Sequence, residues 1–94
     1  MTAAKTIRRC FTVGKHRAIL SVQFAAGVPA GVTVEWEAGP PRLSRRDLAR
    51  YRQLRNAILK GIAQEIGGAI LIADLEADGS ISTRLIEPVA EVTQ

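Results

Sequence analysis

Residues 44–66 are the segment that most constrains the fold, because their apolar side chains recur every three or four positions, as on one face of a helix. Ser44 is a favourable N-cap, and Asp47 follows where a carboxylate stabilises a helix N-terminus. Gly67 and Gly68 supply the C-terminal stop. The spacing therefore predicts one long amphipathic helix. Its apolar stripe consists of Leu48, Tyr51, Leu54, Ile58, Ile62 and Ile66.

The sequence before this helix has the two-residue periodicity of β-strands. Residues 7–13 and 18–24 alternate between apolar and polar side chains around Gly14-Lys15-His16, which predicts a hairpin. Residues 32–37 alternate again and are expected to form a third strand. The stretch between the second and third strands, residues 25–31, contains two glycines and a proline, which predicts a loop.

The sequence after the helix predicts a second hairpin. Residues 69–75 are almost continuously apolar, which indicates a central strand buried on both faces. Asp78-Gly79 is a turn signal, and residues 81–87 alternate as the last strand. The order β-β-β-α-β-β predicts an α+β fold in which the helix packs on one face of a mostly antiparallel sheet. The 94 residues are the size of a single domain, and residues 1–5 and 89–94 are expected to fray.

Catalytic and metal-binding patterns are missing from the sequence. A single cysteine, Cys10, and a single histidine, His16, exclude multi-thiol and multi-histidine metal sites. The run from Asp74 resembles the start of a calcium loop, but its twelfth position, which requires a bidentate glutamate, is Leu85. Glycine-rich phosphate loops and nucleophile elbows are also missing. We therefore expect a binding protein, not an enzyme, with no cofactor, metal or small-molecule substrate.

The location of the protein is predicted from its apolar runs and its thiol. No run reaches the roughly 18–20 residues of a membrane span, so no membrane association is expected. Arg8-Arg9 followed by an apolar stretch loosely resembles a twin-arginine export signal, but Gln23 interrupts that stretch. The single cysteine fits a reducing compartment. A cytoplasmic location is the prediction, and export is the alternative.

The charge of the chain is strongly asymmetric. Residues 1–60 carry twelve lysines and arginines against three acids, whereas residues 61–94 carry one arginine against six acids. The net charge of +4 therefore conceals +9 in the first part and −5 in the second. The basic part is expected to meet an anionic partner, or else the acidic part of the same chain.

The basic residues gather on one face of the predicted helix. At about 100° per residue, Arg46, Arg50 and Lys60 lie opposite the apolar stripe. Seven basic residues between Arg42 and Lys60 stand against the single acid Asp47. Arginine forks along one exposed line suit the phosphates of a nucleic acid, whereas a merely solvated helix face is the alternative. The predicted nucleic-acid-binding residues are Arg8, Arg17, Arg42, Arg45, Arg46, Arg50, Gln53 and Lys60.

Arg8 and Arg17 belong to a second basic surface on the first two strands. In the predicted hairpin their side chains share the face away from the core with those of Thr12, Ser21 and Gln23. Only four aromatic residues are present, which leaves few side chains for base stacking. We therefore expect contact with a duplex backbone more than stacking with single strands or RNA, and the sequence leaves the choice between DNA and RNA open.

Arg55 favours a competing interpretation, because it projects into the apolar stripe of the helix. Its stem can lie over the core with its charge outward, or it can pair with Glu35, Glu37 or a second chain. The apolar strand 69–75 and the acidic C-terminal third also favour contact with another protein. The alternative function is a protein–protein interaction module, or a homodimeric accessory or inhibitor protein, with no nucleic-acid contact.

Overall fold

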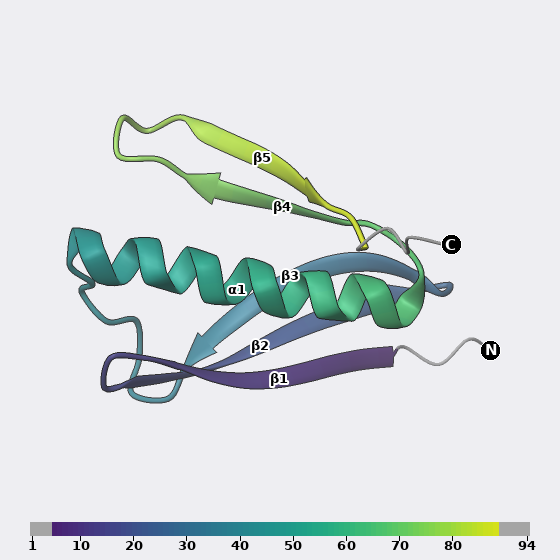
Figure 1. Cartoon of the computed structure of the whole chain (residues 1–94), viewed down its shortest axis with the longest axis horizontal. Helices are drawn as coiled ribbons and strands as arrows, with labels where there is room; N and C mark the ends of the chain where they lie inside the picture. The colour runs from purple at the N-terminus through teal and green to yellow at the C-terminus, as the bar shows by residue number, and fades with distance from the viewer. Residues whose placement is uncertain (1–4, 89–94) are drawn as a thin grey trace, which may run out of the picture. The chain divides into compact units, whose positions relative to one another are not determined.

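The computed structural model describes residues 5–88 (Figure 1). The β-β-β-α-β-β order and the α+β class predicted from the sequence are confirmed. Residues 1–4 and 89–94, which were expected to fray, lie outside the described residues, whereas Lys5 is already part of the first strand. The elements are β1 (Lys5–Val13), β2 (His16–Ala25), β3 (Val28–Trp36), α1 (Arg45–Ile66), β4 (Ile70–Leu75) and β5 (Ile81–Ile86).

The chain divides into two compact units, Met1–Arg55 and Asn56–Gln94, with the boundary inside α1. The five strands form two antiparallel sheets, one in each unit, instead of the single sheet that was expected. The sequence of the first unit carries eleven basic and three acidic residues, and that of the second carries two basic and six acidic residues. The charge asymmetry therefore follows the division of the fold.

The first sheet has the strand order β1-β2-β3. Phe11 pairs with Ala18, and Ala18 pairs with Trp36, so these three side chains lie on one face. On β2 the residues of this face from Ala18 to Phe24 are buried, which confirms the predicted alternation, whereas on β1 only Phe11 and Val13 are buried and Arg9 is exposed. The buried apolar side chains of the three strands are Phe11, Val13, Ala18, Leu20, Val22 and Phe24.

The predicted loop over residues 25–31 is wrong, because β2 and β3 are joined by only two residues. Ala26 and Gly27 both have positive φ angles, 54° and 79°, as in the tight turns that suit the twist of a hairpin. Pro29 lies inside β3, where its missing N–H is tolerated because this strand is at an edge of the sheet. A register shift between Gln23 and Phe24 accommodates the start of β3.

The helix begins and ends close to where its capping residues predict. The Asp47 amide donates to Ser44 Oγ at 3.1 Å, and the Leu48 amide donates to the Ser44 carbonyl at 2.8 Å. At the other end Gly67 has a φ of 68°, and the Gly68 amide donates to the Ala63 carbonyl at 3.1 Å. This pattern is a Schellman C-cap, in which glycine adopts the left-handed conformation without strain.

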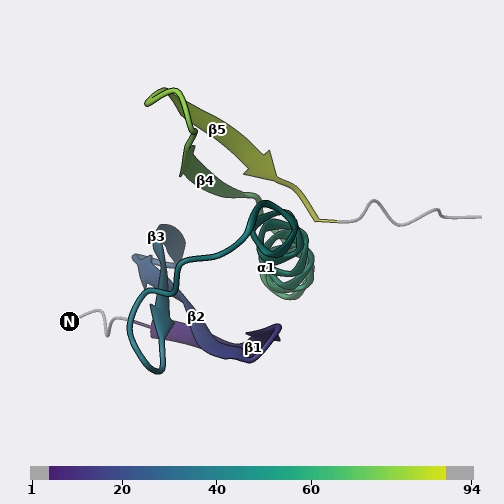
Figure 2. The same cartoon turned by 90° about the vertical axis from the view of Figure 1, so that its left-hand side faces the viewer.

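The second unit contains the two-stranded sheet of β4 and β5, which run side by side in Figures 1 and 2. The Asp78-Gly79 turn is confirmed, with Gly79 at a φ of 87° and the Ser80 amide donating to Asp78 Oδ1 at 2.9 Å. The two-sided burial expected of β4 is wrong, because Leu71 is 65% exposed and Leu75 is 71% exposed. The buried apolar side chains of this unit are Leu59, Ile62, Ala63, Ile70, Ile72 and Ile86.

Candidate nucleic-acid interface

The first turn of α1 has exposed arginines, and its one carboxylate lies beside the β1–β2 turn. Arg45 and Arg46 are exposed, and so is Arg42, which precedes the helix. Figure 2 shows the connection that leads from β3 to α1. Asp47, the single acid of this stretch, has its Oδ2 atom 3.9 Å from the place that a Cβ on Gly14 would take. The carboxylate therefore lies beside the β1–β2 turn.

The positive end of the helix dipole adds to these arginines. The first amides of a helix have no intrahelical acceptors, which favours negative charge at that end. Ser44 Oγ accepts a hydrogen bond from one of these amides, that of Asp47. The electrostatic environment at the start of α1 is consequently positive from both side chains and backbone.

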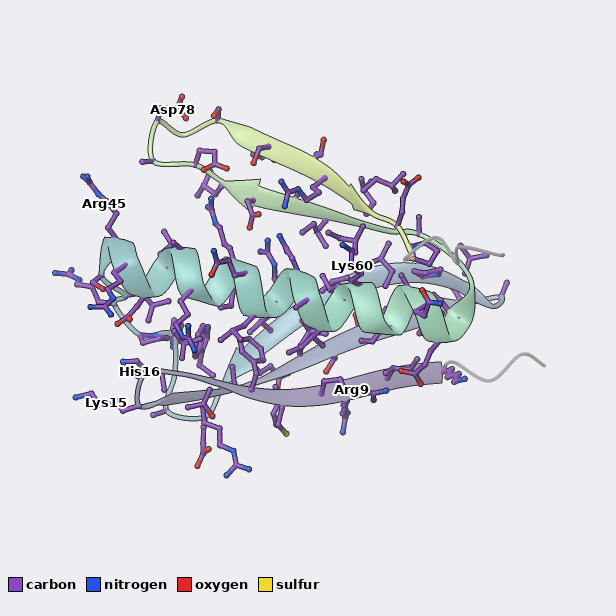
Figure 3. All side chains as sticks on the ribbon, viewed as in Figure 1. Arg9, Lys15, His16, Arg45, Lys60 and Asp78 are labelled. Atoms are coloured by element: carbon purple, nitrogen blue, oxygen red, sulfur yellow. The ribbon has the colours of Figure 1, made fainter. Side chains whose placement is uncertain are left out.

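The same helix carries further exposed polar residues on the side that the sequence predicts. Arg50 and Gln53 are exposed, and their spacing from Arg46 places all three along one side of the helix. Lys60 is also exposed at a matching helical position, in the part of α1 that belongs to the second unit. Figure 3 labels Arg45 and Lys60 on α1.

Lys15 and His16 are additional residues at this end of the unit, and sequence reasoning did not place them in the site. Figure 3 labels Lys15 in the β1–β2 turn and His16 at the start of β2, and the neighbouring Gly14 is the residue that Asp47 approaches. Lys15 is exposed, whereas His16 is half-buried. Their nearness to the helix start depends on how the helix packs on the sheet, so no local pattern in the sequence could indicate it.

Arg8 and Arg17 lie on the predicted common face of the hairpin. Arg8 pairs with Ser21, and Thr12 pairs with Arg17, which brings these side chains to one side of the sheet. Ser21 is buried, but both arginines are exposed. This face also carries acids from β3, because Glu35 pairs with Ile19 on β2.

Glu37 reduces the free positive charge of that face. Its Oε2 atom lies 3.9 Å from Arg17 Nε, and the two side chains are 69% and 65% exposed. An exposed pair of this kind contributes little to stability. It does place a negative charge beside a residue that was predicted to bind phosphate, so part of the positive charge of the sheet face is opposed.

The part of α1 that belongs to the first unit packs on the opposite face of the same sheet. The Tyr51 ring lies 6.0 Å from the Phe11 ring and 5.4 Å from the Trp36 ring, measured between centroids. Phe11 and Arg8 differ by an odd number of positions along β1, so their side chains point to opposite faces. The predicted binding residues of the first unit therefore belong to separate surfaces: Arg8 and Arg17 on the sheet, and Arg42, Arg45, Arg46, Arg50 and Gln53 on or next to α1.

The aromatic residues are used in packing. Phe11, Trp36 and Tyr51 contact one another in the first unit, and Phe11 is only 9% exposed. Arg55 is buried beside them at 5% exposure, with its guanidinium carbon 5.5 Å from the centroid of the Tyr51 ring. A flat stacking surface for unpaired bases would need several such rings turned outward.

Residues 5–88 hold no group of three His, Cys, Asp or Glu side chains placed to bind a metal ion. Over the same residues, no helix has both the length and the apolar character that crossing a bilayer requires. Comparisons with protein-family models, with curated proteins and with solved structures find no match for this chain.

Proposed function

We propose that this protein binds nucleic acid, with duplex DNA as the preferred partner, through the exposed basic residues at the start of α1 and along its outer side. The observation that carries the proposal is the arrangement of residues around the start of α1. Arg42 just before the helix, Arg45 and Arg46 in its first turn and Arg50 in its second are exposed, while Asp47 lies beside the Gly14 turn. The positive helix end reinforces these four charges.

Phosphate is the group that this chemistry suits best. Arginine donates through a planar fork that matches two phosphate oxygens at once, and the free amides of a helix start donate to the same kind of oxygen. The side chains that would read base edges are few in this region, with Gln53 the one exposed amide on that side of the helix within the first unit. Contacts of this kind position a protein on a duplex without selecting a sequence.

The proposal implies a non-enzymatic protein located in the cytoplasm. This compartment contains nucleic acid, and it keeps a cysteine in its reduced thiol form. Cys10 is exposed and free, which fits a reducing compartment. The packed state of Trp36 and Tyr51 supports backbone contact over base stacking.

The test is a binding titration with labelled duplex DNA, single-stranded DNA and RNA, read by fluorescence anisotropy at several salt concentrations. Each neutralised phosphate steepens the fall of log affinity with log salt by about 0.9. Four arginines at the helix start therefore predict a slope of about −3 to −4 for the duplex.

The control compares two double variants of equal charge. Arg46→Glu with Arg50→Glu should reduce duplex affinity at low salt by at least about tenfold and flatten the salt slope by about two. Arg9→Glu with Arg84→Glu changes two exposed arginines that lie elsewhere. Equal losses from both double variants, or no binding by the native chain at low salt, would contradict the proposal.

A further inference from the structure

The β4–β5 hairpin leaves one of its faces apolar and exposed. Of the seven exposed large apolar side chains in residues 5–88, four lie on this hairpin: Leu71, Leu75, Ile81 and Leu85 are 54–71% exposed. Leu71 pairs with Leu85, and Leu75 pairs with Ile81, so all four point to the same side. The hairpin face, as we call it, consists of Leu71, Ala73, Leu75, Ile81, Thr83 and Leu85.

The area of this face is comparable with the largest apolar patches of monomeric proteins. Taking about 30 Å² of accessible surface for each aliphatic carbon, the four large side chains expose about 300 Å². The largest apolar patch of a monomeric protein is typically about 300–600 Å², and such patches often serve in binding. The hairpin face therefore has the extent of an interaction surface.

The chemistry of the face restricts its partner. None of its six residues is charged, so a phosphate backbone finds no cation on it. A charged peptide would lose hydration against it without gaining an ion pair. The partner must itself present an uncharged, apolar surface at the centre of the contact.

The shape of the face fits a copy of itself. The register gives two rows of large side chains, one at each end, separated by a row of the smaller Ala73 and Thr83. When two such faces cross at about a right angle, one of the two usual arrangements of packed sheets, the narrow middle rows meet. The two end rows of large side chains on each copy then lie on either side of the middle row of the other copy. We propose that the hairpin face is the contact between two copies of this chain, related by a two-fold axis.

The size of the face also sets the strength of this contact. Stable interfaces bury about 800 Å² on each partner, so a contact built on about 300 Å² of apolar surface forms a weak, reversible dimer. A tight complex with an unrelated protein would need more surface than the face provides.

Salt dependence separates this contact from nucleic-acid binding. The hairpin and its turn carry Asp74, Glu76 and Asp78 against Arg84, so two copies bring like charges together. Salt screens that repulsion, and dimerisation should therefore strengthen as salt rises. Binding to phosphates weakens under the same change. The dimer is measured without nucleic acid, so it can fail or succeed independently of the proposed function.

The first experiment is sedimentation equilibrium of the native chain from about 10 μM to about 1 mM, at low and high salt. The expected result is a monomer–dimer equilibrium that shifts toward dimer as salt rises. Leu71→Lys should weaken dimerisation at least tenfold, and Thr83→Lys should do the same at the middle of the face. Ala77→Lys, an equal change of charge in the exposed turn of the same hairpin, should not weaken it. A native chain that stays monomeric, or equal effects of all three variants, would overturn the proposal.

The second experiment tests the two-fold symmetry. In a Cys10→Ser background, Ala73→Cys places a thiol in the middle row, where it meets the same residue of the other copy. A short bis-maleimide should crosslink this variant into a covalent dimer, and the yield should rise with protein concentration. Ala77→Cys in the same background should crosslink much less. Equal yields from both thiols, or no crosslinked dimer from Ala73→Cys, would rule out this arrangement.

Discussion

Arg55 lies against Tyr51, with its guanidinium carbon 5.5 Å from the centroid of the ring and only 5% of the residue exposed. Both residues belong to the first unit, one helical turn apart on α1. This distance is within the range of a cation–π interaction, in which the ring face attracts the positive charge. The charge that looked misplaced in the apolar stripe is therefore part of the aromatic packing.

Arg55→Ala should lower the free energy of unfolding by about 2 kcal/mol, because it removes both the cation over Tyr51 and the packing of the long stem. Arg55→Met keeps most of the stem and should cost about 1 kcal/mol or less. Urea unfolding followed by the fluorescence of Trp36 measures both changes. Arg50→Ala is the matched control at an exposed position, with an expected effect within about 0.5 kcal/mol. An Arg55→Ala variant as stable as this control would show that the buried arginine does not support the fold.

Ala18 fills a narrow position between two aromatic residues of the first sheet. It is fully buried and pairs with Phe11 on one side and Trp36 on the other. Ala18→Leu adds three carbons where the packing leaves no room, and we expect a loss of about 1–3 kcal/mol in the free energy of unfolding. Ala30→Leu, at an exposed position of β3, should change stability by less than about 0.5 kcal/mol. Thermal unfolding of the two variants gives the comparison, and equal melting temperatures would contradict the tight packing described here.

Asp78 gives the β4–β5 turn a dependence on pH. The Ser80 hydroxyl and the Ser80 amide both donate to its carboxylate, and these hydrogen bonds lower the pKa of Asp78 below its ordinary value of 3.8. A lowered pKa means that the contribution to stability is present above the unfolded-state pKa of about 3.9 and disappears as pH falls through the folded-state pKa. An NMR titration of the carboxyl carbon should give a pKa below 3.8 in the native chain. In Ser80→Ala, which keeps only the amide donor, this pKa should rise, and an unchanged value would contradict the role of the hydroxyl.

Glu37 should oppose phosphate binding at the sheet face, because it lies 3.9 Å from Arg17. Glu37→Gln leaves Arg17 without this neighbouring charge, and duplex DNA affinity should rise a few-fold at low salt if the sheet face takes part in binding. Stability should change by less than about 1 kcal/mol, as for other exposed ion pairs. The measurement is the same anisotropy titration, with Glu65→Gln as an exposed acid outside this face. An equal gain from both variants would indicate net charge alone, and no gain would confine binding to the helix.

The elements that the sequence predicts best are those with local signals. The bounds of α1 follow from Ser44 and Gly67, whose capping roles depend only on neighbouring residues. The β2–β3 turn could not be predicted in the same way, because its first residue is Ala26, and alanine rarely adopts a positive φ angle. The run of residues 69–75 was ambiguous for another reason. A continuous apolar pattern is the same for a strand that is buried on both faces and for one that exposes an apolar surface.

The candidate site was predictable to a similar degree. Helical periodicity alone places Arg46 and Arg50 opposite the apolar stripe, and both are exposed. The pairing of Arg17 with Glu37 could not be predicted, because it depends on the register of β2 against β3. The position of Asp47 beside Gly14 depends in turn on how the helix packs. Tertiary contacts, which no local pattern contains, therefore decide how much of the basic charge is free.

Every strand pairing in residues 5–88 joins strands that are neighbours in the chain. Low contact order of this kind shortens the loops that must close before pairing begins, and it is associated with fast folding. The β1-β2-β3 sheet uses only residues 5–36, so it can form while the rest of the chain is still being synthesised. We therefore expect rapid folding in which hairpins form early, with few opportunities for the exposed strand edges to aggregate on the way.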